Sequence, residues 1–174
     1  TQFWGDLVEI KKISRLSMLL ALSVVLNIIE TFVPLFNGII PGLKLGLANI
    51  VILISLYIYG FKDTLLLSIL RVFIVGILRT GLFSMSFFFS LSGAILSICM
   101  MFVAKKFSKL SIIGISIVGS LSHTIGQILI AVIFYNINMI YYMALSLILS
   151  IPTGIIIGFL AKEVKKTLDL AIKF

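Results

Sequence analysis

The stretch PGLKLGLAN, Pro41 to Asn49, places a lysine and a carboxamide at the entrance of a long apolar segment. The Pro-Gly pair predicts a break in the chain, and Gly42 and Gly46 leave room for a close approach of backbone or ligand. As a helix, the apolar segment Leu45–Tyr59 is about 22 Å long, against about 30 Å for the hydrocarbon core of a membrane. Lys44 therefore either extends to the membrane surface or lies in a loop that dips into the protein.

Composition predicts an all-α integral membrane protein. Hydrophobic residues make up 61% of the 174 residues and charged residues only 11%, and apolar runs recur along the whole chain. Six helices of about 20 residues with short turns would use the whole length, so we expect one six-helix bundle in the cell membrane, crossing it several times. Breaks in the apolar pattern predict spans over Leu16–Phe36, Leu45–Tyr59, Thr64–Leu78, Leu82–Ala104, Ile112–Tyr135 and Ile140–Ala161.

The ends of the chain differ from this transmembrane domain, which we place at residues 16–161. Residues 1–15 alternate apolar and charged residues, which is compatible with a helix lying on the membrane surface and equally with a disordered cytoplasmic leader. Residues 162–174 form a basic tail.

Positive charge gathers in alternate turns between the predicted spans. By the positive-inside rule these turns and both termini are expected to be cytoplasmic. Lysines confined to short turns serve membrane topology, so nucleic acid is not an expected partner. The cations on this side are Lys11, Lys12, Arg15, Lys62, Lys105, Lys106, Lys109, Lys162, Lys165, Lys166 and Lys173.

Three of the fourteen cations fall in the opposite half: Lys44, Arg71 and Arg79. Glu30 is the one acid expected there with them. Ionisable groups within membrane spans usually face the bundle interior and mark a ligand or ion path. Arg71 and Arg79 are eight residues apart, so on a helix they project within roughly 80° of each other and could line one groove. Arg71 could instead cap helix carbonyls, and Glu30 could simply neutralise one of the cations.

Polar pairs on other helices extend this group. His123 and Gln127 are four residues apart and share a helix face, as do Asn27 and Glu30 three residues apart. Hydrogen bonds between helices are the alternative role for the histidine, the glutamine, Asn27 and Asn49. Together with the cations, these residues would suit a small, anionic ligand.

Small residues form stripes along three of the predicted helices. Ser14, Ser17 and Ala21 line one side of the first, where a docking face for another membrane protein competes with packing inside the bundle. For the other two stripes, packing within the bundle is favoured; they comprise Ser86, Ser90, Gly93 and Ser97, and Gly154 with Gly158.

Four segments resemble a family of small bacterial membrane proteins called heptaprenyl diphosphate synthase component I, or the Gx transporter family: PGLKLGLANI, LRVFIVGILRTG, SLSGAILSICMM and GSLSHTIGQILIA. That family is similar in outline to the substrate-binding S components of energy-coupling factor (ECF) transporters. The resemblance implies six helices, cytoplasmic termini, a ligand pocket near the outer face, and docking on a T subunit driven by two ATPases.

The resemblance also implies roles for matching residues. Lys44 and Asn49 would lie beside the pocket, Arg71 and Arg79 would belong to the third helix, and the fifth helix would contribute its histidine and glutamine. S components dock through an alanine-spaced face of the first helix, and Ser17 to Ala21 offers one alanine of such a pair.

We expect no enzymatic activity, and no catalytic residue, metal or cofactor. Prenyl diphosphate synthesis needs clustered aspartates to hold magnesium against diphosphate, and the chain has no DDxxD motif. It has no GxxxxGK[ST] phosphate loop, so energy for transport would come from a partner. Its single cysteine, Cys99, excludes an internal disulfide. The two expected functions are substrate capture for uptake and, as the alternative, an accessory subunit of polyprenyl diphosphate or quinone-precursor synthesis.

Overall fold

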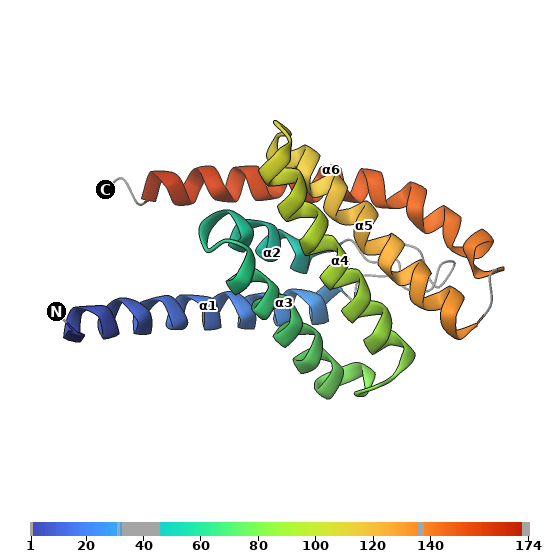
Figure 1. Cartoon of the computed structure of the whole chain (residues 1–174), viewed down its shortest axis with the longest axis horizontal. Helices are drawn as coiled ribbons and strands as arrows, with labels where there is room; N and C mark the ends of the chain where they lie inside the picture. The colour runs from blue at the N-terminus through green and yellow to red at the C-terminus, as the bar shows by residue number, and fades with distance from the viewer. Residues whose placement is uncertain (1, 31, 33–45, 136–137, 172–174) are drawn as a thin grey trace.

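The computed structural model describes residues 2–30, 32, 46–135 and 138–171, and within these ranges the protein is helical (Figure 1). Both ends of the chain lie at the same side of the molecule, at the left of Figure 1. The elements are α1 (Gln2–Glu30), α2 (Leu47–Ile58), α3 (Phe61–Val75), the π-helical turn η1 (Gly76–Thr80), α4 (Met85–Phe107), α5 (Ile112–Phe134) and α6 (Met139–Ala171).

Four of these helices are long and apolar enough to cross a membrane: α1 over Glu9–Glu30, α4, α5, and α6 over Ala144–Leu168. Large apolar side chains are exposed along all four, as on Met18, Ile133 and Phe159. Such a surface suits lipid and would be a liability in water. The protein is therefore a multi-pass membrane protein, as predicted, whereas α2 and α3 are shorter than a typical span.

The first and last helices are longer than the predicted spans. The first was expected over Leu16–Phe36, but α1 begins at Gln2; residues 2–15 contain no proline, so nothing forces a break between the leader and the span. The helix is described as far as Glu30, and residues 33–36 of the predicted span lie outside the described residues. The last was expected to end at Ala161, but the helix continues through the basic segment to Ala171.

Capping residues set the other boundaries. The fourth span was expected from Leu82 to Ala104, but Ser84 accepts a hydrogen bond from the Phe87 N–H, which starts α4 at Met85. Its last turn includes Lys105 and Lys106, which the helix dipole favours at that end.

The second, third and fifth helices follow the predicted positions within a few residues. Ser111 caps α5 by accepting a hydrogen bond from the Gly114 N–H, and α5 ends one residue before the predicted Tyr135. The third helix begins three residues earlier than expected, at Phe61, directly after Gly60 with its φ of 83°.

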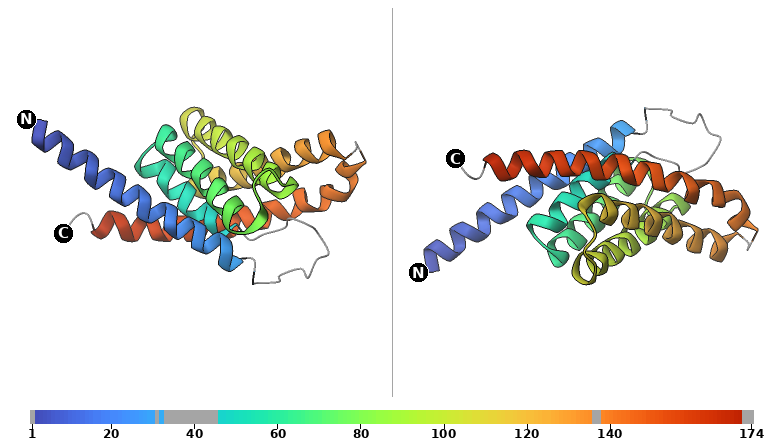
Figure 2. Two further views of the ribbon diagram at one scale, coloured as in Figure 1. Left: turned by 90° about the horizontal axis from the view of Figure 1, so that it is seen from below. Right: turned by 90° about the horizontal axis from the view of Figure 1, so that it is seen from above.

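The helices pack in two groups, which are joined by contacts of α2 with α6 and of α3 with α4. The first helix contacts α2 and α3, while α5 packs against both α4 and α6. Because α2 also contacts α6, it lies between the two longest helices, which extend beyond the others at the end where the chain begins and finishes (Figure 2).

The short helix α2 is the centre of the core. Six consecutive residues, 51–56, are buried, so this helix is covered on all sides by protein. The Nζ of Lys105 donates to the Leu56 carbonyl at 2.8 Å and lies 4.5 Å from the centre of the Tyr57 ring. A cation thus satisfies an otherwise unpaired carbonyl in the last turn of α2.

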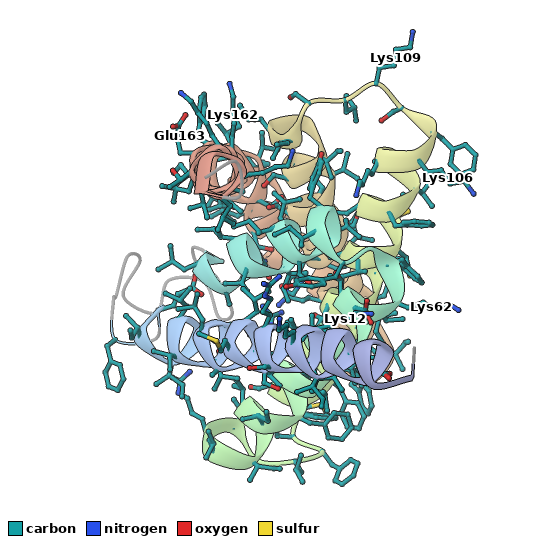
Figure 3. The ribbon with its side chains drawn as sticks, turned by 90° about the vertical axis from the view of Figure 1, so that its left-hand side faces the viewer. Lys12, Lys62, Lys106, Lys109, Lys162 and Glu163 are labelled. Atoms are coloured by element: carbon teal, nitrogen blue, oxygen red, sulfur yellow. The ribbon has the colours of Figure 1, made fainter. Side chains whose placement is uncertain are left out.

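Lysines from α1, α3, α4 and α6 collect at the end of the molecule that holds both termini. Figure 3 views this end and shows Lys62, Lys106 and Lys109 projecting outward from it. Lys12 forms an ion pair with Asp63 at 2.7 Å, which ties α1 to the first turn of α3.

Glycines allow the closest helix crossings. A Cβ atom on Gly126 of α5 would lie 2.8 Å from the Ser92 carbonyl oxygen and 2.9 Å from the Gly93 Cα, both backbone atoms of α4. On α6, a Cβ atom on Gly158 would lie 2.7 Å from the Ile113 Cα of α5. The favoured interpretation of the Gly154 and Gly158 pair, packing inside the bundle, is therefore correct.

We expect Lys105→Ala to lower the free energy of unfolding by about 1.5–3 kcal/mol, because it leaves a buried carbonyl of α2 without its charged donor. Lys106→Ala is the matched control. Lys106 is the exposed neighbour of Lys105, so its replacement should change the free energy of unfolding by less than about 0.5 kcal/mol. Thermal unfolding in detergent measures both, and equal effects would contradict this role of Lys105.

Gly126→Ala should destabilise the bundle by about 1–3 kcal/mol, because the added methyl group meets α4 backbone that cannot move alone. Gly114→Ala is the control: its Cβ would meet only the side chain of Leu110, which is exposed and can shift. If both variants melt alike in the same detergent, the α4–α5 crossing is looser than described.

Candidate functional site

A polar cavity of about 380 Å³ lies among the described helices, in the half of the molecule away from the termini. It is bounded by the end of α1, the start of α2, the end of α3 with η1, the start of α4, and by α5 and α6. Its lining comprises Asn27, Glu30, Gly46, Ala48, Asn49, Arg71, Val72, Val75, Arg79, Thr80, Ser86, Phe87, Phe89, Ser90, Ser120, His123, Thr124, Gln127, Ser146, Ser150, Thr153 and Ile157.

The structure brings most of the predicted site residues into this one cavity. That they bind a ligand stays a prediction. Lys44, the eighth residue predicted, lies outside the described residues. The seven that line the cavity are Asn27, Glu30, Asn49, Arg71, Arg79, His123 and Gln127.

Arg71 is the most unusual of them, because its charged side chain is only 4% exposed within the bundle. One terminal nitrogen donates to the Asn49 Oδ1 at 3.2 Å, which joins α3 to the first turn of α2. Its Nε is buried and has no hydrogen-bond partner in the part of the chain that the structure describes. A buried guanidinium with an unmet donor is costly, so an anion in the cavity would stabilise it.

Glu30 supplies a negative charge to the same cavity and is 5% exposed. Its carboxylate accepts a hydrogen bond from the Gly46 N–H at the start of α2, where the helix dipole favours an anion. It also interacts electrostatically with Arg71, which agrees with the alternative that Glu30 neutralises one of the cations. With the carboxylate of Glu30 and the guanidinium groups of Arg71 and Arg79, the described lining carries one net positive charge.

Gly46 must be a glycine at this corner. Its φ is 76°, a conformation that L residues with a side chain rarely adopt, and a Cβ atom would lie 2.9 Å from the Ile157 Cδ1. The close approach predicted for Gly46 is therefore present, and it brings the start of α2 against α6.

The histidine and glutamine of α5 line the cavity from one face, as their spacing predicted. The ring of His123 lies directly over Gly93, since a Cβ atom there would be 2.9 Å from the ring Cε1 and Nε2. Because Gly93 of α4 has no side chain, the imidazole has room to lie at the cavity wall.

The lining also contains residues that the sequence analysis did not single out. Ser86 and Ser90 were assigned to packing, but they face the cavity, while Ser97 does pack, donating to the Gly119 carbonyl at 2.8 Å. The hydroxyl residues of α6 were missed, although their spacing of four and three residues places them on one helix face; they are Ser146, Ser150 and Thr153.

The proposed docking residues lie away from the cavity. Ser14, Ser17 and Ala21 are exposed on α1, beside Met18, which is 70% exposed. This face of α1 is open to lipid or to another protein.

A polar, cation-bearing cavity among apolar helices that are long enough to cross a membrane defines the class: a multi-pass membrane protein with an internal polar cavity. The chain belongs to the heptaprenyl diphosphate synthase component I family, whose family model matches residues 19–164. Comparisons with curated proteins and with solved structures gave no significant match.

Proposed function

We propose that this protein is a substrate-capture subunit, similar to the S components of ECF transporters, which binds a small anionic molecule from outside the cell. The observation that carries this proposal is the buried guanidinium of Arg71, whose Nε has no partner among the described residues and which lines a cavity shared with Arg79. An anionic group in the cavity would stabilise the charge of this guanidinium in a low-dielectric setting, where charge-assisted interactions are strong.

In this proposal the bundle crosses the membrane six times, with both termini in the cytoplasm and the cavity in the outer half. The short α2 and α3 would cross with the help of neighbouring helices, since both are packed against longer ones. Support comes from the gathering of lysines at the end that holds both termini (Figure 3).

Energy for uptake would come from a T subunit and two ATPases. The exposed face of α1 with Ser14, Ser17 and Ala21 is the proposed docking surface, because small residues allow a partner helix to approach closely.

We further propose that the protein has no catalytic activity of its own. Among the described lining residues, Glu30 is the single carboxylate, whereas magnesium-dependent diphosphate chemistry requires several. In the described residues, no group of three or more histidine, cysteine, aspartate or glutamate side chains could hold a metal ion.

A second candidate, favoured by the family description, is a membrane accessory subunit of a separate prenyl diphosphate synthase. In this role the separate synthase would carry out the synthesis, because the described cavity lining contains one carboxylate, Glu30, whereas magnesium-dependent diphosphate chemistry requires several.

Membrane topology can be tested with single cysteines in a Cys99→Ser background. Thr80→Cys, at the cavity, should react with a membrane-impermeant maleimide added outside intact cells, whereas Lys109→Cys should react only after permeabilisation. The reverse pattern would invert the proposed orientation and end the capture model.

The proposed function predicts what the protein retains when it is extracted from its native membrane in mild detergent. We expect a small anion, detected by mass spectrometry, together with a T subunit and ATPases. Arg79→Ala and Lys44→Ala should each weaken binding of that anion about tenfold, because each removes a charge-assisted contact of about 1.5 kcal/mol. Lys109→Ala, at the opposite end, is the control. Recovery with a soluble prenyl synthase alone would instead support the accessory role.

A further inference from the structure

Three hydroxyl groups of the cavity wall each donate their single proton in a hydrogen bond to a backbone carbonyl of their own helix. Thr124 Oγ1 donates to the Ser120 carbonyl at 3.2 Å. On α6, Ser150 Oγ donates to the Leu147 carbonyl at 2.6 Å and Thr153 Oγ1 to the Ser150 carbonyl at 2.9 Å.

A hydroxyl has one proton and two lone pairs, so once the proton is used the group can only accept a further hydrogen bond. These three side chains therefore offer acceptors to the cavity. Two of them are nearly inaccessible to solvent, since Ser150 is 4% and Thr124 is 7% exposed. All three side chains line the cavity, so a ligand bound there could donate to them.

The arginines present the opposite chemistry to the same cavity. A guanidinium only donates, and the buried Nε of Arg71 still lacks an acceptor in the described part of the chain. Arg71 and Arg79 come from α3 and η1, whereas the hydroxyls come from α5 and α6. Because α3 packs against α4 and α4 packs against α5, the two arginines and the three hydroxyls reach the cavity from different sides of α4.

We propose that the ligand of this cavity is bipolar: one anionic group next to Arg71, and a hydroxyl or amino group that donates to the hydroxyl acceptors of α5 and α6. This inference rests on the proposed capture function. The volume of 380 Å³ restricts the ligand to a compact molecule that fits both groups within the cavity. A simple fatty or prenyl anion, which has no donor at its far end, would leave the acceptors unused.

The test compares two acids that differ only in the donor. Hexanoate and 6-hydroxyhexanoate are titrated into the purified full-length protein by calorimetry, with octanoate and 8-hydroxyoctanoate as a longer pair. We expect the hydroxy acid to bind about tenfold more tightly in at least one pair, since a site that accepts from a ligand hydroxyl discriminates against the analogue without it.

Thr153→Val keeps the side-chain shape and removes one of the three acceptors, so this variant should have a reduced preference for the hydroxy acid. Thr167→Val is the matched control: it lies on the same helix, its Oγ1 donates to the Glu163 carbonyl at 3.0 Å, and it is exposed and outside the cavity lining. The control should retain the preference for the hydroxy acid.

The outcomes separate this inference from the proposed function. Equal binding of both acids, reduced by Arg79→Ala, would overturn the bipolar ligand and leave anion capture standing. A preference that is unchanged in Thr153→Val would also overturn the assignment of the acceptors. If neither acid of either pair binds, both the bipolar ligand and the capture of small anions are contradicted.

Discussion

The structure depends on how a short, buried helix is held at both ends. The twelve residues of α2 extend about 18 Å, little more than half of a membrane core of about 30 Å. The carboxylate of Glu30 accepts a hydrogen bond from the Gly46 N–H at the start of α2, and the ammonium of Lys105 donates one to the Leu56 carbonyl near the end of α2. Each charge has the sign that the helix dipole favours at that end. These contacts satisfy backbone groups that lipid could not.

Because α2 is short, it does not extend over the whole length of the helices around it. The half that holds both termini is packed with apolar side chains around residues such as Leu53 and Leu56. Beyond the start of α2, the ends of α1 and α3 and the beginnings of α4 and α6 enclose the polar cavity. One helix thus accounts for both the close-packed core and the space above it, and it carries Asn49, which holds the Arg71 guanidinium.

Close helix crossings keep that cavity in shape. Backbone atoms of α4 and α5 approach at Gly93 and Gly126, and α5 and α6 approach at Gly158. Packing of this kind replaces the hydrophobic effect, which does not favour association between helices already surrounded by lipid. The cavity can then contain arginine, histidine and hydroxyl groups, because the helices are held together by contacts elsewhere.

The sequence by itself determined the class of protein and most of the candidate site. Its apolar runs predicted a helical multi-pass membrane protein, and polar residues isolated in those runs marked the cavity, because burial of a charge in a membrane requires a partner. Tertiary structure alone decided that Ser86 and Ser90 face the cavity while Ser97 packs, since one stripe of small residues meets different neighbours along its length. It also decided which hydroxyl groups donate to backbone carbonyls, because these hydrogen bonds depend on side-chain rotamers that helical periodicity does not specify.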